Sequence, residues 1–290
     1  MFGLRGRAGL ARFRFVCAAL LCWVCVTGCQ SKRGIASGEG LQGQPLVMII
    51  PRAPQRLDPR YIGDAYGLKV SRLLYASLVT IDPISLEPIP DLADRVAQVS
   101  PLRYDVRLRP GLRFSDGSPL EATDVAETFE ALKSDRVKSR YARNYKRIKS
   151  IEVRDPLRLS FVLESPHATF LTDLEFPVLR RDQAWVPGQD EDAQRLPELV
   201  GAGPYRLVAL GAGMLELAAN ERWHGGRPSH PRVRLLVIRD DNTRALRLRA
   251  GAGDLALNAI PPLLVPLFEG KPDFEVRSAP GIGTTYLGFN

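Results

Sequence analysis

Cysteine is scarce in this sequence, and its positions leave no pair for a disulfide in the folded part. Of four cysteines among 290 residues, three lie in one N-terminal apolar run, and Cys29 follows the end of that run. A chain cleaved before Cys29 keeps only that cysteine, so its fold must rest on a hydrophobic core. A hydrophobic content of 45% is ample for such a core in a chain of this length.

Histidine is also scarce, and the sequence lacks the common catalytic motifs. His224 and His230 are six residues apart in a Gly/Pro-rich loop, which is poor spacing for a metal pair, and His167 stands alone. We expect all three to be loop histidines at the surface. A Gly-x-Ser-x-Gly elbow, a His-Glu-x-x-His motif and a Walker loop are all missing, and no free cysteine remains as a nucleophile. The sequence therefore predicts a protein that is not an enzyme and has neither a metal nor another cofactor.

Acidic residues are absent from the first 28 positions, which contain four arginines and a short apolar run at 15–26. That run has the length of a signal peptide and is too short to span a bilayer comfortably. Val26-Thr27-Gly28-Cys29 resembles the bacterial lipobox, where cleavage precedes a cysteine whose thiol carries a lipid. We predict a lipoprotein signal peptide over 1–28 and lipidation of Cys29. The alternatives are an ordinary signal peptide that ends in cysteine, or a poor membrane anchor.

Residues 29–45 are polar and rich in Gly and Ser, without apolar periodicity, and predict a flexible tether. Loss of the four N-terminal arginines lowers the net charge from +8 to +4. The remaining basic residues are scattered among acidic ones, so we expect no nucleic-acid partner. The densest basic run, Lys133 to Lys149, also contains Tyr141 and Tyr145 and is interpreted as a solvated helix or loop face.

Strand-like and helix-like segments alternate without strict order after residue 45, which indicates a mixed α/β fold. Apolar spacing predicts helices over 66–78, 123–133 and 242–250, and at the start of 168–179. Thr123 and Asn242 are the candidate N-caps of the second and third. Strands are expected at 46–50, 78–81, 104–108, 150–154, 158–163, 205–209, 214–218, 232–239, 255–259 and 284–290.

Several short motifs occur in a fixed order along the chain. They are Arg56-Leu57-Asp58-Pro59, Leu74-Tyr75-Ala76-Ser77-Leu78-Val79, Ile89-Pro90-Asp91-Leu92-Ala93, the span 108–125 with Ser115-Asp116-Gly117-Ser118-Pro119, Gly201-Ala202-Gly203-Pro204-Tyr205, Asn220-Glu221-Arg222-Trp223, Ala250-Gly251 with Asp254, and Tyr286-Leu287-Gly288-Phe289-Asn290. Each is weak alone. The ordered set resembles the extracytoplasmic solute-binding proteins of ABC importers, family 5, which serve peptides, dipeptides and nickel. Ala202 and Glu121 replace the threonines usual in that family, and the second change moves the expected helix cap to Thr123.

The resemblance implies an α/β fold like that of periplasmic binding proteins, type II, peptide-binding cluster. It places lobe I at 46–78 and 158–283, an inserted subdomain at 79–157, and the start of the crossing to a second lobe at 284–290. The family's Tyr-x-x-Phe-Asn lies near that crossing, and here it is the end of the chain. We therefore expect the second lobe to be missing, through either a fragment or a truncated gene product.

The same resemblance implies that a ligand lies extended between two closing lobes. Its near wall would be the loop with Ala53 and Pro54 and the terminal strand with Thr285 and Tyr286, and Tyr141 is a further candidate. The turn residues Asp116, Gly117, Gly203 and Pro204 are interpreted as structural. Simple packing is the alternative role for each ligand candidate.

The leading hypothesis is a lipid-anchored binding protein that delivers a solute, most often a peptide in this family, to ABC permease subunits in the membrane. Nickel chelates and sugars are other solutes of the family. This hypothesis places the protein on the periplasmic side of the cell envelope, attached through Cys29 to the inner or outer membrane. The alternative is a truncated envelope lipoprotein that acts as a docking module without transport.

Overall fold

The computed structural model describes residues 44–186, 199–211 and 213–279. The expectations for 1–43 and 280–290, including Cys29, Thr285 and Tyr286, lie outside these ranges. The elements in chain order are β1 Leu46–Ile50, α2 Ala65–Leu74, β2 Val79–Ile81, β3 Pro88–Pro90, β4 Ala93–Ser100, β5 Arg103–Leu108, α3 Ala122–Lys133, α4 Ala142–Tyr145, β6 Ile148–Asp155, β7 Arg158–Leu163, α5 Phe170–Asp173, α6 Arg181–Ala184, β8 Tyr205–Gly211, β9 Met214–Ala219, β10 Arg232–Val237, α7 Asp241–Arg249 and the 3₁₀ helix η1 Pro262–Leu267. Among these helices, none combines the length and the apolar character needed to cross a bilayer.

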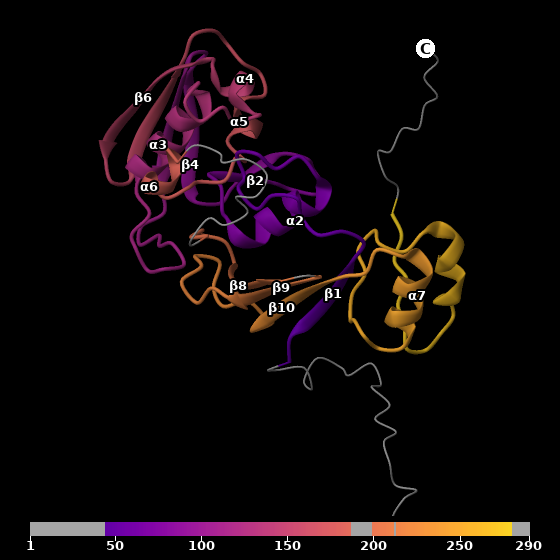
Figure 1. Ribbon diagram of the computed structural model, residues 1–290. Helices are drawn as coiled ribbons and strands as arrows, with labels where there is room; N and C mark the ends of the chain where they lie inside the picture. The colour runs from indigo at the N-terminus through magenta and orange to yellow at the C-terminus, as the bar shows by residue number, and fades with distance from the viewer. Residues whose placement is uncertain (1–43, 187–198, 212, 280–290) are drawn as a thin grey trace, which may run out of the picture. The chain divides into compact units, whose positions relative to one another are not determined.

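The first sheet joins the beginning of the described chain to its later part. Its strand order is β1-β10-β9-β8, with β1 parallel to β10 and the other pairs antiparallel. Figure 1 shows indigo β1 beside orange β10, which is far away in sequence. A parallel pair requires a crossover connection, and here the crossover contains the entire second sheet. The expected strands at 46–50, 205–209, 214–218 and 232–239 are confirmed to within two residues.

Helix α2 packs on this sheet through Val70, Leu74 and the following Tyr75, against Leu217 and Leu235 among others. It ends at Leu74 rather than at the expected residue 78. The reason is a close approach by the Gly201–Gly203 loop, because a Cβ at Gly201 would lie 2.0 Å from the Leu74 carbonyl oxygen. The Gly203 amide donates to that same carbonyl at 3.0 Å. The motif around Gly201 therefore allows the loop to pack closely on the end of α2, and the helix ends there.

The second sheet has the order β4-β5-β7-β6 and is antiparallel throughout. The hairpin expected from 150 to 163 is confirmed as β6 and β7. Strand β4 was not expected, because most of its side chains are exposed or half-buried and give no apolar alternation. The subdomain boundary expected at 157/158 falls between two paired strands, since β7 pairs with both β5 and β6.

Helix α3 covers this sheet with a fully buried aromatic side chain, Phe129. Its ring lies 5.1 Å from that of Phe161 on β7 and 5.3 Å from that of Tyr145 on α4, both edge to face. Val125 and Leu132 on the same helix are also fully buried. The short helix α4 and strand β7, which follow α3 in the chain, therefore pack against one face of it.

Two predicted helix caps were wrong, each by a short shift toward the N-terminus. The N-cap of α3 is Glu121, whose amide donates to the Asp124 carboxylate at 2.9 Å. The hydroxyl of Thr123 is buried without a hydrogen-bond partner in the described structure. The N-cap of α7 is Asp240, which accepts from the Thr243 amide at 2.7 Å, not Asn242. In both cases a carboxylate lies three residues from the group with which it pairs, as capping geometry requires.

A strand was expected at 255–259, but the structure has only one bridge there, between Met48 and Leu255. Buried Arg244 of α7 explains the difference. Its guanidinium donates to the Ala259 carbonyl and, at 2.8 Å, to the Ile238 carbonyl. The Ala259 carbonyl is thus satisfied by a side chain rather than by a neighbouring strand.

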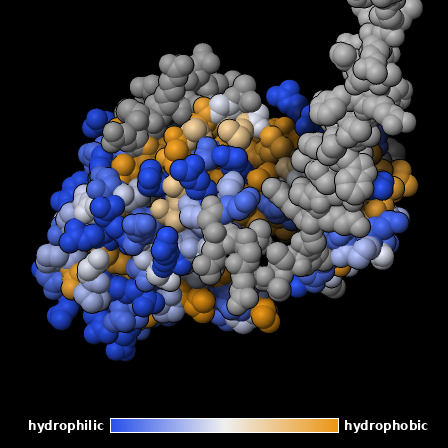
Figure 2. All heavy atoms as spheres, turned by 90° about the horizontal axis from the view of Figure 1, so that it is seen from below, coloured by the Kyte–Doolittle hydropathy of each residue, from blue (hydrophilic) through white to orange (hydrophobic). Residues whose placement is uncertain are grey.

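Charged and apolar side chains are interspersed over the surface in Figure 2, where blue hydrophilic residues surround smaller orange areas. The most exposed large apolar side chains in the described ranges are Ile84, at 92%, and Leu263, at 88%. Ile84 lies in the turn between β2 and β3, so its truncation should cost little stability.

Candidate ligand-binding site

The loop between β1 and α2, residues 51–64, carries two of the ligand contacts expected from the sequence. Ala53 is exposed and Pro54 is buried. Neither the amide nor the carbonyl of Ala53 has a hydrogen-bond partner within the described part of the chain. Exposed backbone groups of this kind can pair with the backbone of an extended ligand.

The loop is held in place by Arg60, whose side chain is only 2% exposed. The guanidinium binds both carboxylate oxygens of Asp58, at 3.0 and 2.6 Å. It also donates to the carbonyls of Ala184 and Val186, each at 2.7 Å. Burial opposes the charge of Arg60, but Asp58 outweighs it, so the pKa of Arg60 is raised and the group stays protonated.

Tyr141, the third described candidate, lies against the same loop. Its hydroxyl donates to the Ile62 carbonyl at 2.6 Å, and its ring packs at 5.8 Å from that of Phe176. The hydroxyl proton is therefore engaged within the protein, while the oxygen lone pairs can still accept from a ligand. The structure thus brings Tyr141 together with the loop of Ala53 and Pro54. Thr285 and Tyr286 lie outside the described residues.

Tyr66 and Asn258 adjoin this loop and were not expected at the site. Asp64 caps α2 by accepting from the amides of Tyr66, at 3.0 Å, and Gly67, at 2.8 Å. The Tyr66 hydroxyl donates to the Asn258 carbonyl at 3.3 Å. Burial raises the pKa of Tyr66, with the charges of Arg244 and Arg52 acting in the opposite direction. The helix predicted over 66–78 already placed Tyr66 at the end of the loop, but its contact with Asn258 has no signal in the sequence.

The histidines are less exposed than expected. His224 hydrogen-bonds Asp91 at 2.6 Å, and His167 hydrogen-bonds Asp173 at 2.8 Å. Their side chains are only 14% and 21% exposed, which corrects the prediction of surface loop histidines for these two. Each pair joins two segments of chain and satisfies a partly buried carboxylate. Within the described ranges, no three His, Cys, Asp or Glu residues gather in a way that could hold a metal ion.

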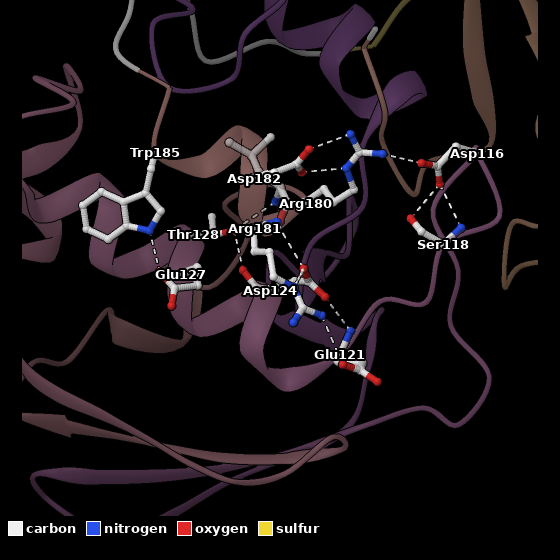
Figure 3. A network of polar contacts seen from close by, with 11 residues as sticks. Asp116, Ser118, Glu121, Asp124, Glu127, Thr128, Arg180, Arg181, Asp182 and Trp185 are labelled. Carbon is white, nitrogen blue, oxygen red and sulfur yellow. Dashed lines mark hydrogen bonds and ion pairs between the residues drawn. The ribbon is translucent and has the colours of Figure 1, made fainter.

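A polar network connects α3 and the turn before it to the segment that enters α6 (Figure 3). Asp124, whose side chain is 1% exposed, accepts from both the amide and the guanidinium of Arg181 at 3.1 Å. Arg180 binds Asp182 at 2.6 Å and also pairs with Asp116 in the turn. This network fixes the Asp116-Gly117 turn by contacts inside the protein, as its structural interpretation predicted.

The ionisation of Asp116 should make the free energy of unfolding depend on pH. Burial alone would raise the pKa of Asp116, but hydrogen bonds from Ser118 and the charge of Arg180 outweigh it, so that pKa is lowered. Its contribution is therefore complete above the unfolded value, about 3.9, and is lost as pH falls through the lower folded value. Urea titrations should show Asp116→Asn destabilised by about 1 kcal/mol at neutral pH, with the difference from the parent shrinking by about pH 3.

The matched control is Asp135→Asn, because Asp135 is 93% exposed and pairs only with Lys146, at 3.2 Å, in the described structure. We expect this control to stay within about 0.5 kcal/mol of the parent at every pH. If Asp116→Asn loses the same free energy of unfolding at neutral and at acid pH, the charge of Asp116 does not contribute to stability.

Comparison with known proteins identifies the family. A model of the bacterial extracellular solute-binding proteins, family 5 middle region, matches residues 87–290. The chain belongs to this family. The match includes the turn and helix of the most characteristic motif, and it confirms the resemblance inferred from the ordered motifs.

Among its curated relatives, Protein XP55 of Streptomyces lividans is 29% identical and aligns with 87% of this chain and 46% of its own. Di/tripeptide-binding protein 4 of Pseudomonas aeruginosa is 26% identical and aligns with 88% of this chain and 52% of its own. The chain therefore spans about half the length of these relatives.

A solved structure, NikZ from Campylobacter jejuni in complex with Ni(L-His), is 26% identical, with a TM-score of 0.70 over 78% of this chain and 45% of NikZ. The expected α/β fold of family-5 periplasmic binding proteins is thus confirmed over this length. Family 5 consists of solute-binding proteins rather than enzymes, in agreement with the prediction that this chain is not an enzyme.

Proposed function

We propose that this protein is the extracytoplasmic binding component of an ABC importer, anchored by a lipid on Cys29, and that it binds peptides. Membership of family 5 supports the binding role, and the relative named as a di/tripeptide-binding protein supports the ligand class. Its place is the periplasmic side of the cell envelope, where it would hand the peptide to permease subunits.

The single observation that carries the peptide assignment is that the amide and carbonyl of Ala53 have no hydrogen-bond partner among the described residues, on a loop held by Arg60. An extended peptide can pair with this amide and carbonyl as an added strand would, without any special side chain. Pro54 is buried and sets the backbone direction of the loop, while Tyr141 provides an aromatic wall beside it. Thr285 and Tyr286 complete the proposed near wall.

In this proposal, the first sheet and α2 belong to lobe I, and strands β4, β5 and β6 with α3 belong to the inserted subdomain. The division follows the proposed boundaries of 46–78 and 158–283 for the lobe, 79–157 for the subdomain and 284–290 for the crossing to lobe II. Because β7 pairs within the second sheet, the return to lobe I would begin after residue 163. A second lobe would close over the peptide and exclude water.

Peptide binding and membrane attachment can be tested together. The parent chain and Cys29→Ser are expressed with the signal peptide in a bacterial host, and binding of radiolabelled Ala-Ala-Ala is measured in membrane and soluble fractions. We expect the parent's binding activity in the membrane fraction and that of Cys29→Ser in the soluble fraction, with equal affinity. The lipid contributes roughly 0.8 kcal/mol per buried methylene, so its loss should release the protein completely.

Each half of the proposal can fail separately. A parent protein that is found in the soluble fraction would refute the anchor but not peptide binding. A correctly anchored protein that binds neither Ala-Ala-Ala nor a mixed tripeptide library would refute the receptor role. It would favour the second candidate, a docking lipoprotein without transport.

A further inference from the structure

Arg140 lies directly over the loop that carries Ala53. Gly63 makes room for it, since a Cβ at position 63 would lie 1.7 Å from a terminal guanidinium nitrogen of Arg140. Two neighbours fix the backbone on either side of this arginine. The Ser139 hydroxyl donates to the Arg60 carbonyl at 2.9 Å, and the Tyr141 hydroxyl donates to the Ile62 carbonyl at 2.6 Å. The hydrogen bonds of Ser139 and Tyr141 therefore hold the backbone of Arg140 against the loop.

The segment around Arg140 has a large excess of positive charge. Between residues 133 and 149 there are eight basic side chains and one acidic one. Lys146 pairs with Asp135, the one acid of this run, at 3.2 Å, and Lys133 pairs with Glu130 at 2.9 Å. No carboxylate of the described chain pairs with exposed Arg140, whose guanidinium instead lies 5.8 Å from the centre of the Tyr141 ring.

The underlying loop, residues 51–64, does not neutralise this charge, because it contains three arginines and only two aspartates. Asp58 is bound by buried Arg60 at 2.6 Å. Asp64 accepts from the amides at the start of α2 and from the Gln55 amide at 3.2 Å. Arg52 next to Ala53 is exposed and adds further positive charge. This loop and the segment 133–149 together therefore give the surface near Ala53 an excess of positive charge.

We infer that the site prefers peptides that present a carboxylate to Arg140. A guanidinium can bind both oxygens of a carboxylate while it lies beside an aromatic ring, as Arg140 lies beside Tyr141. The carboxylate could belong to an acidic side chain or to the peptide's C-terminus, and both have the same chemistry. This inference rests on the proposed peptide-binding function and adds the charge class of the peptide.

The test uses the full chain in detergent and three tripeptides measured by isothermal titration calorimetry. Ala-Glu-Ala amide carries only a side-chain carboxylate, Ala-Gln-Ala free acid carries only a terminal one, and Ala-Gln-Ala amide carries neither. We expect one of the two carboxylate peptides to bind about tenfold more tightly than the neutral one, and the stronger one identifies the source. Arg140→Gln should abolish this preference without changing the Kd of Ala-Gln-Ala amide.

Lys149→Gln is the matched control, because it makes the same charge change at an exposed position of β6. It should keep the full preference. In the parent, the preference should weaken between about 50 and about 500 mM salt, as a screened ion pair requires.

Equal affinity of the parent for all three peptides would overturn the inference while leaving peptide binding intact. The inference would also be overturned if Arg140→Gln kept the preference for carboxylate peptides. It would be overturned as well if Lys149→Gln removed the preference equally, because the preference would then reflect the overall charge of the protein. Binding of none of the three would overturn the proposed function together with this inference. A last outcome combines two results: the parent shows no peptide preference, and anionic phosphatidylserine vesicles retain the parent but not Arg140→Gln. This outcome would overturn the inference and assign Arg140 to a lipid surface.

Discussion

Phe129→Ala should destabilise the protein by about 3–5 kcal/mol, the range expected when a fully buried phenylalanine is truncated. Phe129 has 0% exposure and meets Phe161 and Tyr145 edge to face, with ring centroids at 5.1 and 5.3 Å. The surrounding rings belong to a strand and a short helix, so they cannot close the cavity without moving the backbone. Urea unfolding followed by far-UV circular dichroism measures the loss.

Ile84→Ala is the control for this experiment, because Ile84 is 92% exposed and its truncation removes few contacts. We expect this control within about 0.5 kcal/mol of the parent. A loss below about 1.5 kcal/mol for Phe129→Ala would contradict the close packing of α3 on the second sheet, since it would mean that the site collapses freely.

Arg60→Met should cost a similar amount, about 3–5 kcal/mol, for an electrostatic reason. The substitution keeps the length of the side chain but leaves the Asp58 carboxylate, which is 15% exposed, without its partner. The carbonyls of Ala184 and Val186 also lose their donor. Because Arg60 holds the Ala53 loop, we also expect peptide affinity to fall, and calorimetry with Ala-Ala-Ala would measure that loss.

Two further variants test whether the loss in Arg60→Met comes from the burial of the Asp58–Arg60 pair or from the removal of an arginine charge as such. Arg72→Met removes an arginine that is 74% exposed and pairs with Glu175 at 3.1 Å, and it should cost less than about 1 kcal/mol. The double variant Asp58→Asn with Arg60→Met removes both charges and should recover part of the stability lost in the single variant. If the double variant is less stable by the full sum of the single effects, the Asp58–Arg60 pair is not coupled and the explanation fails.

Local patterns were sufficient for most strands and for the family. The hairpin from 150 to 163 and the pair β8–β9 have alternating apolar residues next to Asp-Pro or glycine turns, so each could be predicted without its neighbours. Strand β4 could not, since its exposed pattern has no apolar period and its pairing with β5 alone defines it. The end of α2 at Leu74 depends on a glycine loop that lies over 120 residues further along the chain.

The candidate site also combines residues that the sequence predicted with residues that only the tertiary structure brought together. Ala53 and Pro54 were predicted from the family resemblance, with Tyr141 of the basic segment as a further candidate, and whether they contact a ligand is still a prediction. The placement of Tyr141 against the loop of Ala53 and Pro54 depends on the Tyr141–Ile62 hydrogen bond, and the loop itself is held by the bonds of Arg60 to a distant segment. Arg140 and Asn258 belong to no motif and were found only because the fold brings Arg140 to Gly63 of the loop and pairs Asn258 with Tyr66.

The sequence by itself determined the family, the mixed α/β class and the scarcity of cysteine that makes the fold depend on its core. These follow from local residue order and composition, which need no spatial neighbours. The tertiary structure decided where helices end, which acids neutralise which bases, and which arginines stay buried or free. Such properties depend on contacts between residues that are distant in the chain, and the burial of charges such as Arg60 and Asp124 is set by those contacts alone.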